Sequence, residues 1–81
     1  MMKIERQIGK DGTVFEKIDG NWRIIQSVDY KGSTICWDKN ANPEMVIDRD
    51  GTRWEKDNKT GNLRMTRIRC SDGAFLDIGY D

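Results

Sequence analysis

The segment TVFEKIDGNWRI, residues 13–24, has the pattern of a β-hairpin. β-Branched and aromatic residues, which favour extended strands, stand on both sides of an Asp-Gly pair. Asp19 and Gly20 favour a two-residue hairpin turn, because both positions of that turn need positive φ angles. The segment therefore predicts strands over residues 13–18 and 22–28, joined at this turn.

Similar turn signals recur about every ten residues along the rest of the chain. Ile and Val number 12, whereas Leu and Ala number 4, and this composition favours strands over helices. The adjacent Ile24 and Ile25 interrupt the alternation and predict a β-bulge or a change of face. The predicted strands cover residues 3–8, 13–18, 22–28, 33–38, 44–48, 52–57, 62–70 and 74–80.

The two halves of the chain resemble each other. Residues 8–17 (IGKDGTVFEK) align with residues 47–56 (IDRDGTRWEK). A period near 40 residues is typical of a repeated supersecondary unit. We expect one all-β domain over residues 1–81, with tandem antiparallel meanders at about 1–38 and 44–81. They would form a small barrel or sandwich of six to eight short strands. A propeller blade has a similar period, but two blades would need oligomerisation to close a ring.

The composition argues against an enzyme. The 81 residues include 14 basic and 14 acidic side chains, so the net charge is zero, and histidine is absent. Histidine is the commonest general base and metal ligand near neutral pH. Cys36 and Cys70 cannot complete a structural zinc site without other ligands. We therefore expect no catalytic residues, no metal and no cofactor.

The sequence also predicts where the protein resides. No apolar run approaches the roughly 20 residues that a membrane-spanning helix needs. Lys3, Glu5 and Arg6 interrupt any apolar core of a signal peptide. The chain is therefore expected to be cytoplasmic, without a membrane partner and with Cys36 and Cys70 as reduced thiols.

One loop has the opening spacing of a calcium-binding motif. Asp38, Asn40 and Asn42 stand at alternate positions, as the first ligands of such a loop do. Pro43 stands where the motif needs glycine, and Arg49 stands where it needs a bidentate glutamate. We interpret the segment as a polar loop without a metal.

Paired carboxylates are a second motif with catalytic potential. Glu16 and Glu55 occupy equivalent places in the two aligned segments. Arg23 and Arg64 would lie opposite them across a hairpin. We therefore expect exposed ion pairs rather than acid–base chemistry.

The charge is unevenly distributed in the second half. Residues 53–69 contain six basic and two acidic side chains, whereas residues 70–81 contain three acidic side chains and no basic one. A basic strand could pair with the acidic last strand, or it could offer a surface for phosphates and stacked bases. Arg67 and Arg69 are expected to form an exposed pair near Asp72 or Asp77. The candidate binding residues are Arg53, Trp54, Arg64, Arg67 and Arg69.

These observations predict a non-catalytic protein-binding module. A small β scaffold rich in charged side chains offers patches for electrostatic recognition, and tryptophan is a common interface anchor. Small domains of this style occur in phages and mobile elements as inhibitors or adaptors of host proteins. The alternative is a single-stranded nucleic-acid-binding β-barrel that uses the basic, tryptophan-containing face. The sequence specifies neither the partner nor the oligomeric state.

Overall fold

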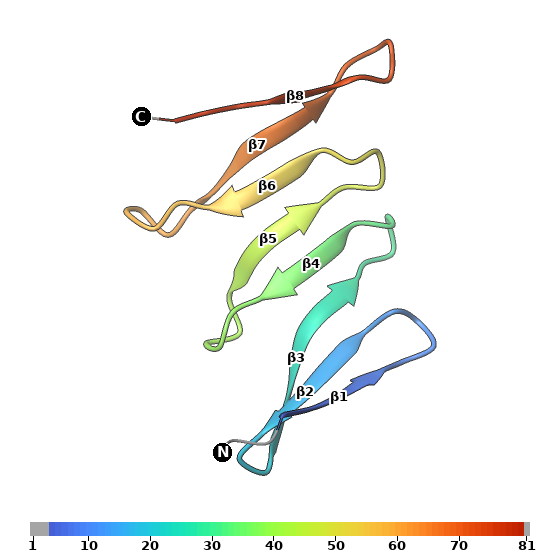
Figure 1. Cartoon of the computed structure of the whole chain (residues 1–81), viewed down its shortest axis with the longest axis vertical. Helices are drawn as coiled ribbons and strands as arrows, with labels where there is room; N and C mark the ends of the chain where they lie inside the picture. The colour runs from blue at the N-terminus through green and yellow to red at the C-terminus, as the bar shows by residue number, and fades with distance from the viewer. Residues whose placement is uncertain (1–3, 81) are drawn as a thin grey trace.

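The computed structural model describes residues 4–80, and within that range every regular element is a β-strand. The strands form one antiparallel sheet in which each strand pairs with the next along the chain, from β1 to β8 (Figure 1). The strands are β1 (Ile4–Ile8), β2 (Val14–Ile18), β3 (Asn21–Val28), β4 (Thr34–Trp37), β5 (Pro43–Ile47), β6 (Arg53–Lys56), β7 (Leu63–Arg69) and β8 (Phe75–Asp77). Each predicted strand overlaps one of these, although β3 and β5 each begin one residue earlier than predicted. Lys3, the first residue of the first prediction, lies outside the described range.

The expected barrel or sandwich is wrong. β1 and β8 lie at opposite ends of the stack of strands and do not pair, so the sheet stays open (Figure 1). Every connection is a tight turn between two strands that pair with each other, so no segment passes into a second layer. The result is a single sheet with principal extents of 45 × 32 × 22 Å.

The structure does not confirm two separate repeats. Phe15 pairs with Ile24 and Trp54 pairs with Met65, and a register shift precedes both Phe15 and Trp54. These correspondences are local to one hairpin in each half. β4 pairs with β5 as any other neighbours do, so no boundary divides the sheet into two units.

Five of the seven turns share one hydrogen-bonding scheme, which the β5–β6 turn illustrates. The amide of Asp48 donates to the carbonyl of Thr52 at 2.7 Å, and the amide of Gly51 donates to the carbonyl of Asp48 at 2.9 Å. Asp50 Oδ1 accepts a further bond from the Thr52 amide at 2.9 Å. Asp and Gly recur at the turns because the carboxylate satisfies a free amide and glycine accepts the positive φ. The same pair of backbone bonds begins at Gly9, Asp29, Asp38, Asp48 and Cys70.

Two local predictions are confirmed. Asp19 and Gly20 have φ angles of 53° and 86°, as the predicted two-residue hairpin turn requires. Ile25 is the extra residue of a bulge, because Phe15 pairs with Ile24 whereas Val14 pairs with Gln26. Beyond this bulge the alternation of β3 is reversed, so Ser27, which pairs with Ile35, lies on the same face as Ile24, and Val28 lies on the other face.

One face of the sheet collects most of the large apolar side chains. Paired residues lie on the same face, and side chains alternate along each strand. The bulge in β3 and a second bulge in β7 keep these residues in line across the strands. We call this surface the apolar face; its members are Phe15, Ile24, Ile35, Trp37, Val46, Trp54, Met65, Ile68 and Leu76.

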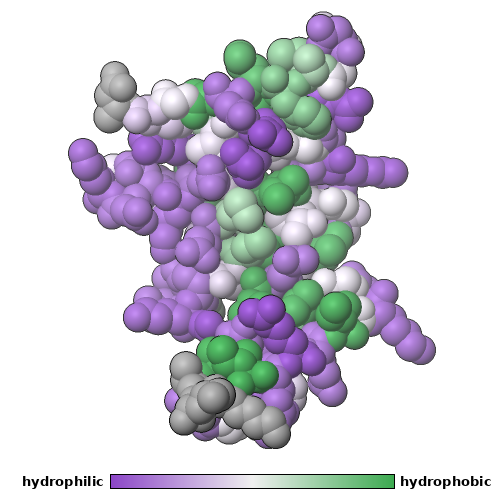
Figure 2. All heavy atoms as spheres, in the orientation of Figure 1, coloured by the Kyte–Doolittle hydropathy of each residue, from purple (hydrophilic) through white to green (hydrophobic). Residues whose placement is uncertain are grey.

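A single layer cannot bury these side chains fully. Among residues 4–80, no hydrophobic side chain is buried, and the residues that are buried are Glu16, Ser33 and Thr52. Figure 2 shows hydrophobic residues gathered in a broken column across the strands, with hydrophilic residues on both sides. The fold therefore depends on the hydrogen-bonded ladder, the turns and partial apolar contacts within one layer.

The turn geometry predicts the effect of two matched substitutions. A Cβ at Gly51, where φ is 97°, would lie 2.7 Å from Cε1 of Phe75, whereas one at Gly61, where φ is 77°, would meet no atom within 4 Å. Gly61→Ala should lower the free energy of unfolding by about 1–2 kcal/mol, the cost of a left-handed backbone. Gly51→Ala should lower the free energy of unfolding further, because the Phe75 ring must also move.

Urea denaturation of the full chain measures both values. Phe75→Ala serves as the background control, since Gly51→Ala should then cost no more than Gly61→Ala does. Equal losses for the two glycine variants in the wild-type background would contradict the expected clash.

Candidate functional site

The five candidate binding residues lie on β6 and β7 but do not form one surface. Trp54 pairs with Val46 and Met65 and therefore belongs to the apolar face. Arg53 pairs with Arg67, on the opposite face. The predicted combination of arginines with a stacking tryptophan is thus divided between the two sides of the sheet.

The bulge in β7 determines where the arginines point. Arg53 pairs with Arg67 and Trp54 with Met65, so Thr66 is an extra residue. Without it, Arg64 and Arg67 would project to opposite faces, because they are three residues apart. The bulge brings Arg64 to the same face as Arg53 and Arg67.

Arg67 is bound to the last strand, as the sequence predicts. Its Nε donates to Asp77 Oδ1 at 2.6 Å and its Nη2 donates to Asp77 Oδ2 at 3.2 Å. This hydrogen-bonded pair raises the pKa of Arg67 and lowers that of Asp77. The guanidinium also lies 5.4 Å from the centre of the Phe75 ring. Arg69 donates to the carbonyl of Asp50 at 3.4 Å, so it joins the β5–β6 turn instead.

The remaining arginines also have internal partners. Arg53 Nε lies 3.5 Å from Glu55 Oε2. Arg64 Nη2 lies 3.8 Å from Asp57 Oδ1, and its guanidinium carbon lies 4.0 Å from the centre of the Tyr80 ring. The expected Glu55–Arg64 ion pair is therefore not formed, although the two residues face each other in the ladder. The basic segment is largely neutralised by its own neighbours.

Glu16 forms a more enclosed cluster on the same face. Its carboxylate accepts from Arg6 Nε at 3.2 Å and from Arg23 Nη2 at 3.3 Å. The expected Glu16–Arg23 pair is confirmed, but Glu16 is 6% exposed rather than on the open surface. The buried Nε atom of Arg23 has no hydrogen-bond partner. One donor beside this cluster is therefore unused.

The sheet opens between β3 and β4. The ladder between these strands covers only three pairs, which join residues 26–28 of β3 to residues 34–36 of β4. Residues 21–24 of β3 pair with β2 alone, and β3 curves away from β4 below the bulge (Figure 1). We call this opening the split. It leaves one side of the β3 backbone without a strand partner.

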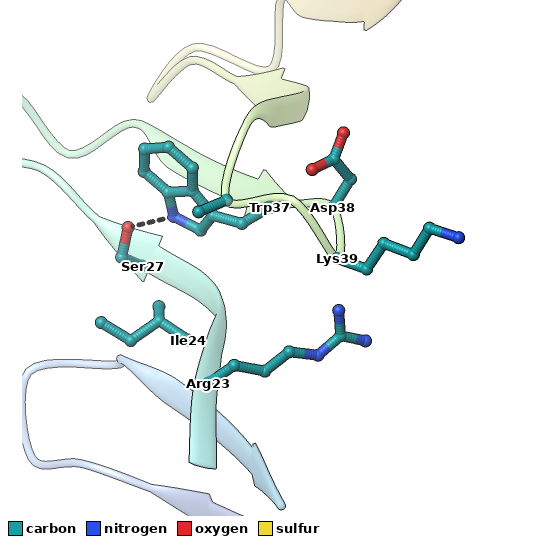
Figure 3. Close-up of a pocket in the computed structure, with 7 residues that line it drawn as sticks. Arg23, Ile24, Ser27, Trp37, Asp38 and Lys39 are labelled. Carbon is teal, nitrogen blue, oxygen red and sulfur yellow. Dashed lines mark hydrogen bonds between the residues drawn. The ribbon is translucent and has the colours of Figure 1, made fainter. Parts of the chain in front are cut away.

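A hollow of about 430 Å³ lies in the split (Figure 3). Ile24 and the Trp37 indole form its apolar wall, and Trp37 Nε1 donates to Ser27 Oγ at 2.9 Å. This hydrogen bond satisfies the indole N–H, so the ring can stand beside the hollow without an unpaired donor. The lining residues are Arg23, Ile24, Ser27, Trp37, Asp38, Lys39 and Ala41.

The charged side of the hollow is positive. Asp38 Oδ2 accepts from Lys56 Nζ at 2.6 Å, and its Oδ1 accepts from the amides of Asn40 and Asn42. The bond from Lys56, followed by the bond from the Asn42 amide, lowers the pKa of Asp38 to about 2. Lys39 has no carboxylate partner among residues 4–80 and extends to the same side as Arg23 in Figure 3.

The calcium-like spacing of Asp38, Asn40 and Asn42 is explained by the turn between β4 and β5. The Asp38 carboxylate binds amides of its own loop and one lysine, which leaves it the role of a turn-stabilising group. Among residues 4–80, no group of three or more His, Cys, Asp or Glu side chains is placed to hold a metal ion.

The two cysteines are not joined to each other. Cys36 is half-buried, and its Sγ lies 4.0 Å from Gln26 Oε1. Burial, with a smaller contribution from Glu44, raises the pKa of the Cys36 thiol. The thiol is therefore protonated and weakly nucleophilic near neutral pH.

Sequence reasoning missed the hollow. It identified the bulge at Ile24 and Ile25 and the polar loop that begins at Asp38. It did not combine them, because the opening depends on the pairing of β3 with both of its neighbours. The available signal was the bulge, since a bulge bends the strand that carries it.

The comparisons with known proteins identify no relative. No protein-family model matches the chain, and neither a curated protein nor a solved structure matches it. The described residues contain no helix that is long and apolar enough to span a membrane.

The Asp38–Lys56 pair predicts a specific pH dependence. A carboxyl whose pKa is about 2 in the folded state and 3.8 when unperturbed stabilises the fold above pH 4, and this contribution is lost as the pH falls toward 2. Lys56→Met should raise the pKa of Asp38 toward 3.8. It should also reduce the loss of unfolding free energy between pH 4 and pH 2.

Carboxyl chemical shifts of Asp38, followed by NMR against pH, measure the first effect. Lys59→Met is the matched control, because the Lys59 side chain forms no ion pair with Asp38. An unchanged Asp38 midpoint in Lys56→Met would show that the loop amides alone lower this pKa.

Proposed function

We propose that this protein is a non-catalytic protein-binding module that captures an extended segment of its partner at the split. The observation that carries the proposal is the unpaired side of β3 next to an apolar hollow. An exposed strand can accept a partner strand, with backbone hydrogen bonds that supply affinity and side-chain pockets that supply specificity.

The chemistry of the hollow specifies the segment. Trp37 and Ile24 suit one large apolar side chain, and the hollow of about 430 Å³ provides space for it. Arg23 and Lys39 favour an acidic side chain nearby in the segment, because charge complementarity fixes the register of docking. The partner segment is therefore extended, with an aromatic or aliphatic anchor flanked by Asp or Glu.

The geometry gives less support to single-stranded nucleic acid as the partner. Arg53, Arg64 and Arg67 are engaged with carboxylates of the chain itself. Trp54 lies on the other face, and its Nε1 donates to Asp48 Oδ2 at 3.1 Å. Phosphate binding and base stacking would thus have to occur on opposite sides of the sheet.

Selection from a displayed library of random peptides tests the proposal even though the partner is unidentified. Selected peptides should carry a large apolar residue beside acidic ones, and their binding should be measured by calorimetry. Lys39→Glu should weaken binding by roughly tenfold, which corresponds to about 1.4 kcal/mol. Lys10→Glu, in the β1–β2 turn, should leave the affinity unchanged.

Two results would contradict the proposal. One is a set of selected peptides that lack acidic residues or bind Lys39→Glu as tightly as the wild type. The other is salt-sensitive binding of a single-stranded oligonucleotide, with a steep fall in affinity as salt rises. The second result would replace protein binding with nucleic-acid binding.

A further inference from the structure

The apolar face is only partly covered, and three of its nine members, Ile24, Ile68 and Leu76, are exposed. Leu76 is 58% exposed and Ile24 is 45% exposed, and the other members of the face are at best half-buried. The opposite face has a different chemistry, because it carries the Glu16 cluster and the Arg67–Asp77 pair. The opposite face also carries exposed apolar residues, among them Ile8, Val28 and Phe75, but they stand among these charged groups, so the apolar face is the better suited of the two to a dry interface.

The accessible surface of the chain is larger than expected for a compact monomer of its mass. The chain has 6396 Å² of accessible surface and a mass of 9.4 kDa. A folded monomer of that mass is expected to expose about 5,000 Å². The excess is about 1,400 Å² for each chain, by the same scaling. Stable interfaces bury about 800 Å² per partner, and homodimers often bury more.

We propose that two copies of this chain associate through their apolar faces and form a two-layer β-sandwich. Covering each face with the other copy would remove about the excess surface, which is enough for a stable homodimer. Two sheets pack face to face at a spacing of about 10 Å, with interdigitated side chains. The zero net charge of the chain presents no overall repulsion between copies.

The indole N–H groups of Trp37 and Trp54 on this face are already bonded. Asp48 accepts from Trp54 Nε1 at 3.1 Å and from Ser33 Oγ at 3.1 Å, and Trp37 Nε1 is bound to Ser27. Covering the face therefore leaves neither indole N–H without a partner, which would otherwise oppose association. The rings remain available as apolar anchors.

The dimer and the proposed peptide site share two side chains, because Ile24 and Trp37 belong both to the apolar face and to the wall of the hollow. In Figure 3, Arg23 and Lys39 extend to one side of the hollow, whereas Ile24, Ser27 and Trp37 lie on the other. A segment that enters from the charged side therefore competes with the second copy for Ile24 and Trp37. The dimer does not depend on peptide binding, and each is tested separately.

Sedimentation equilibrium of the full chain between about 1 and 100 μM tests the dimer. The expected mass is twice 9.4 kDa. Replacing the cross-strand pair Ile68 and Leu76 with lysines (I68K/L76K) should raise the dissociation constant at least tenfold. Ile8→Lys is the matched control, since Ile8 is 77% exposed and lies on the opposite face, and it should leave the constant unchanged.

Urea unfolding of the wild type is a second test of the dimer, and it applies even if the double variant does not fold. The urea midpoint of the wild type should rise with protein concentration, because dissociation accompanies unfolding. A monomeric wild type at 100 μM, or a midpoint that does not change with concentration, would overturn the dimer. Assemblies larger than a dimer, or a dimer broken only by Ile8→Lys, would instead indicate association through another surface and would also overturn it.

Discussion

Each strand is tied to the next by a turn that is too short for any other strand to intervene, and this constraint shapes the rest of the molecule. The turns close with the same two backbone bonds wherever five residues connect two strands. A chain built in this way can only extend its sheet by one neighbour at a time. All apolar side chains are therefore placed on one of two open faces, and partial contact within one layer is the most they achieve.

The polar groups consequently take the most enclosed places. Glu16 lies between two arginines from the neighbouring strands, and Ser33 and Thr52 lie beside the turns. A carboxylate held by two guanidinium groups is stabilised by charge-assisted hydrogen bonds that offset its desolvation. In this sheet the buried positions are polar, because a single layer has no interior in which apolar side chains could be enclosed.

The two faces and the split divide the candidate functions of the molecule. The apolar face offers apolar area, and the split offers an unpaired strand edge beside the Trp37 hollow. The arginines on the other face are held by Asp77, Asp57 and Glu55. These pairs stiffen the last three strands and leave little free positive charge there. The proposed peptide site and the proposed dimer thus overlap at Ile24 and Trp37, and the peptide site adds the unpaired edge of β3 and the charged side of the hollow.

The sequence by itself determined the strands and the turns. Asp19 and Gly20 fixed their hairpin, and Arg67 met Asp77, because these interactions depend on residues that are close along the chain or across one turn. Only the tertiary structure decided that the sheet stays open, since closure depends on whether the first and last strands meet. It also decided the face on which Arg64 lies and the opening beside Trp37. One extra residue in a strand reverses the face of every side chain beyond it. Local sequence signals do not specify which of two paired strands carries that extra residue.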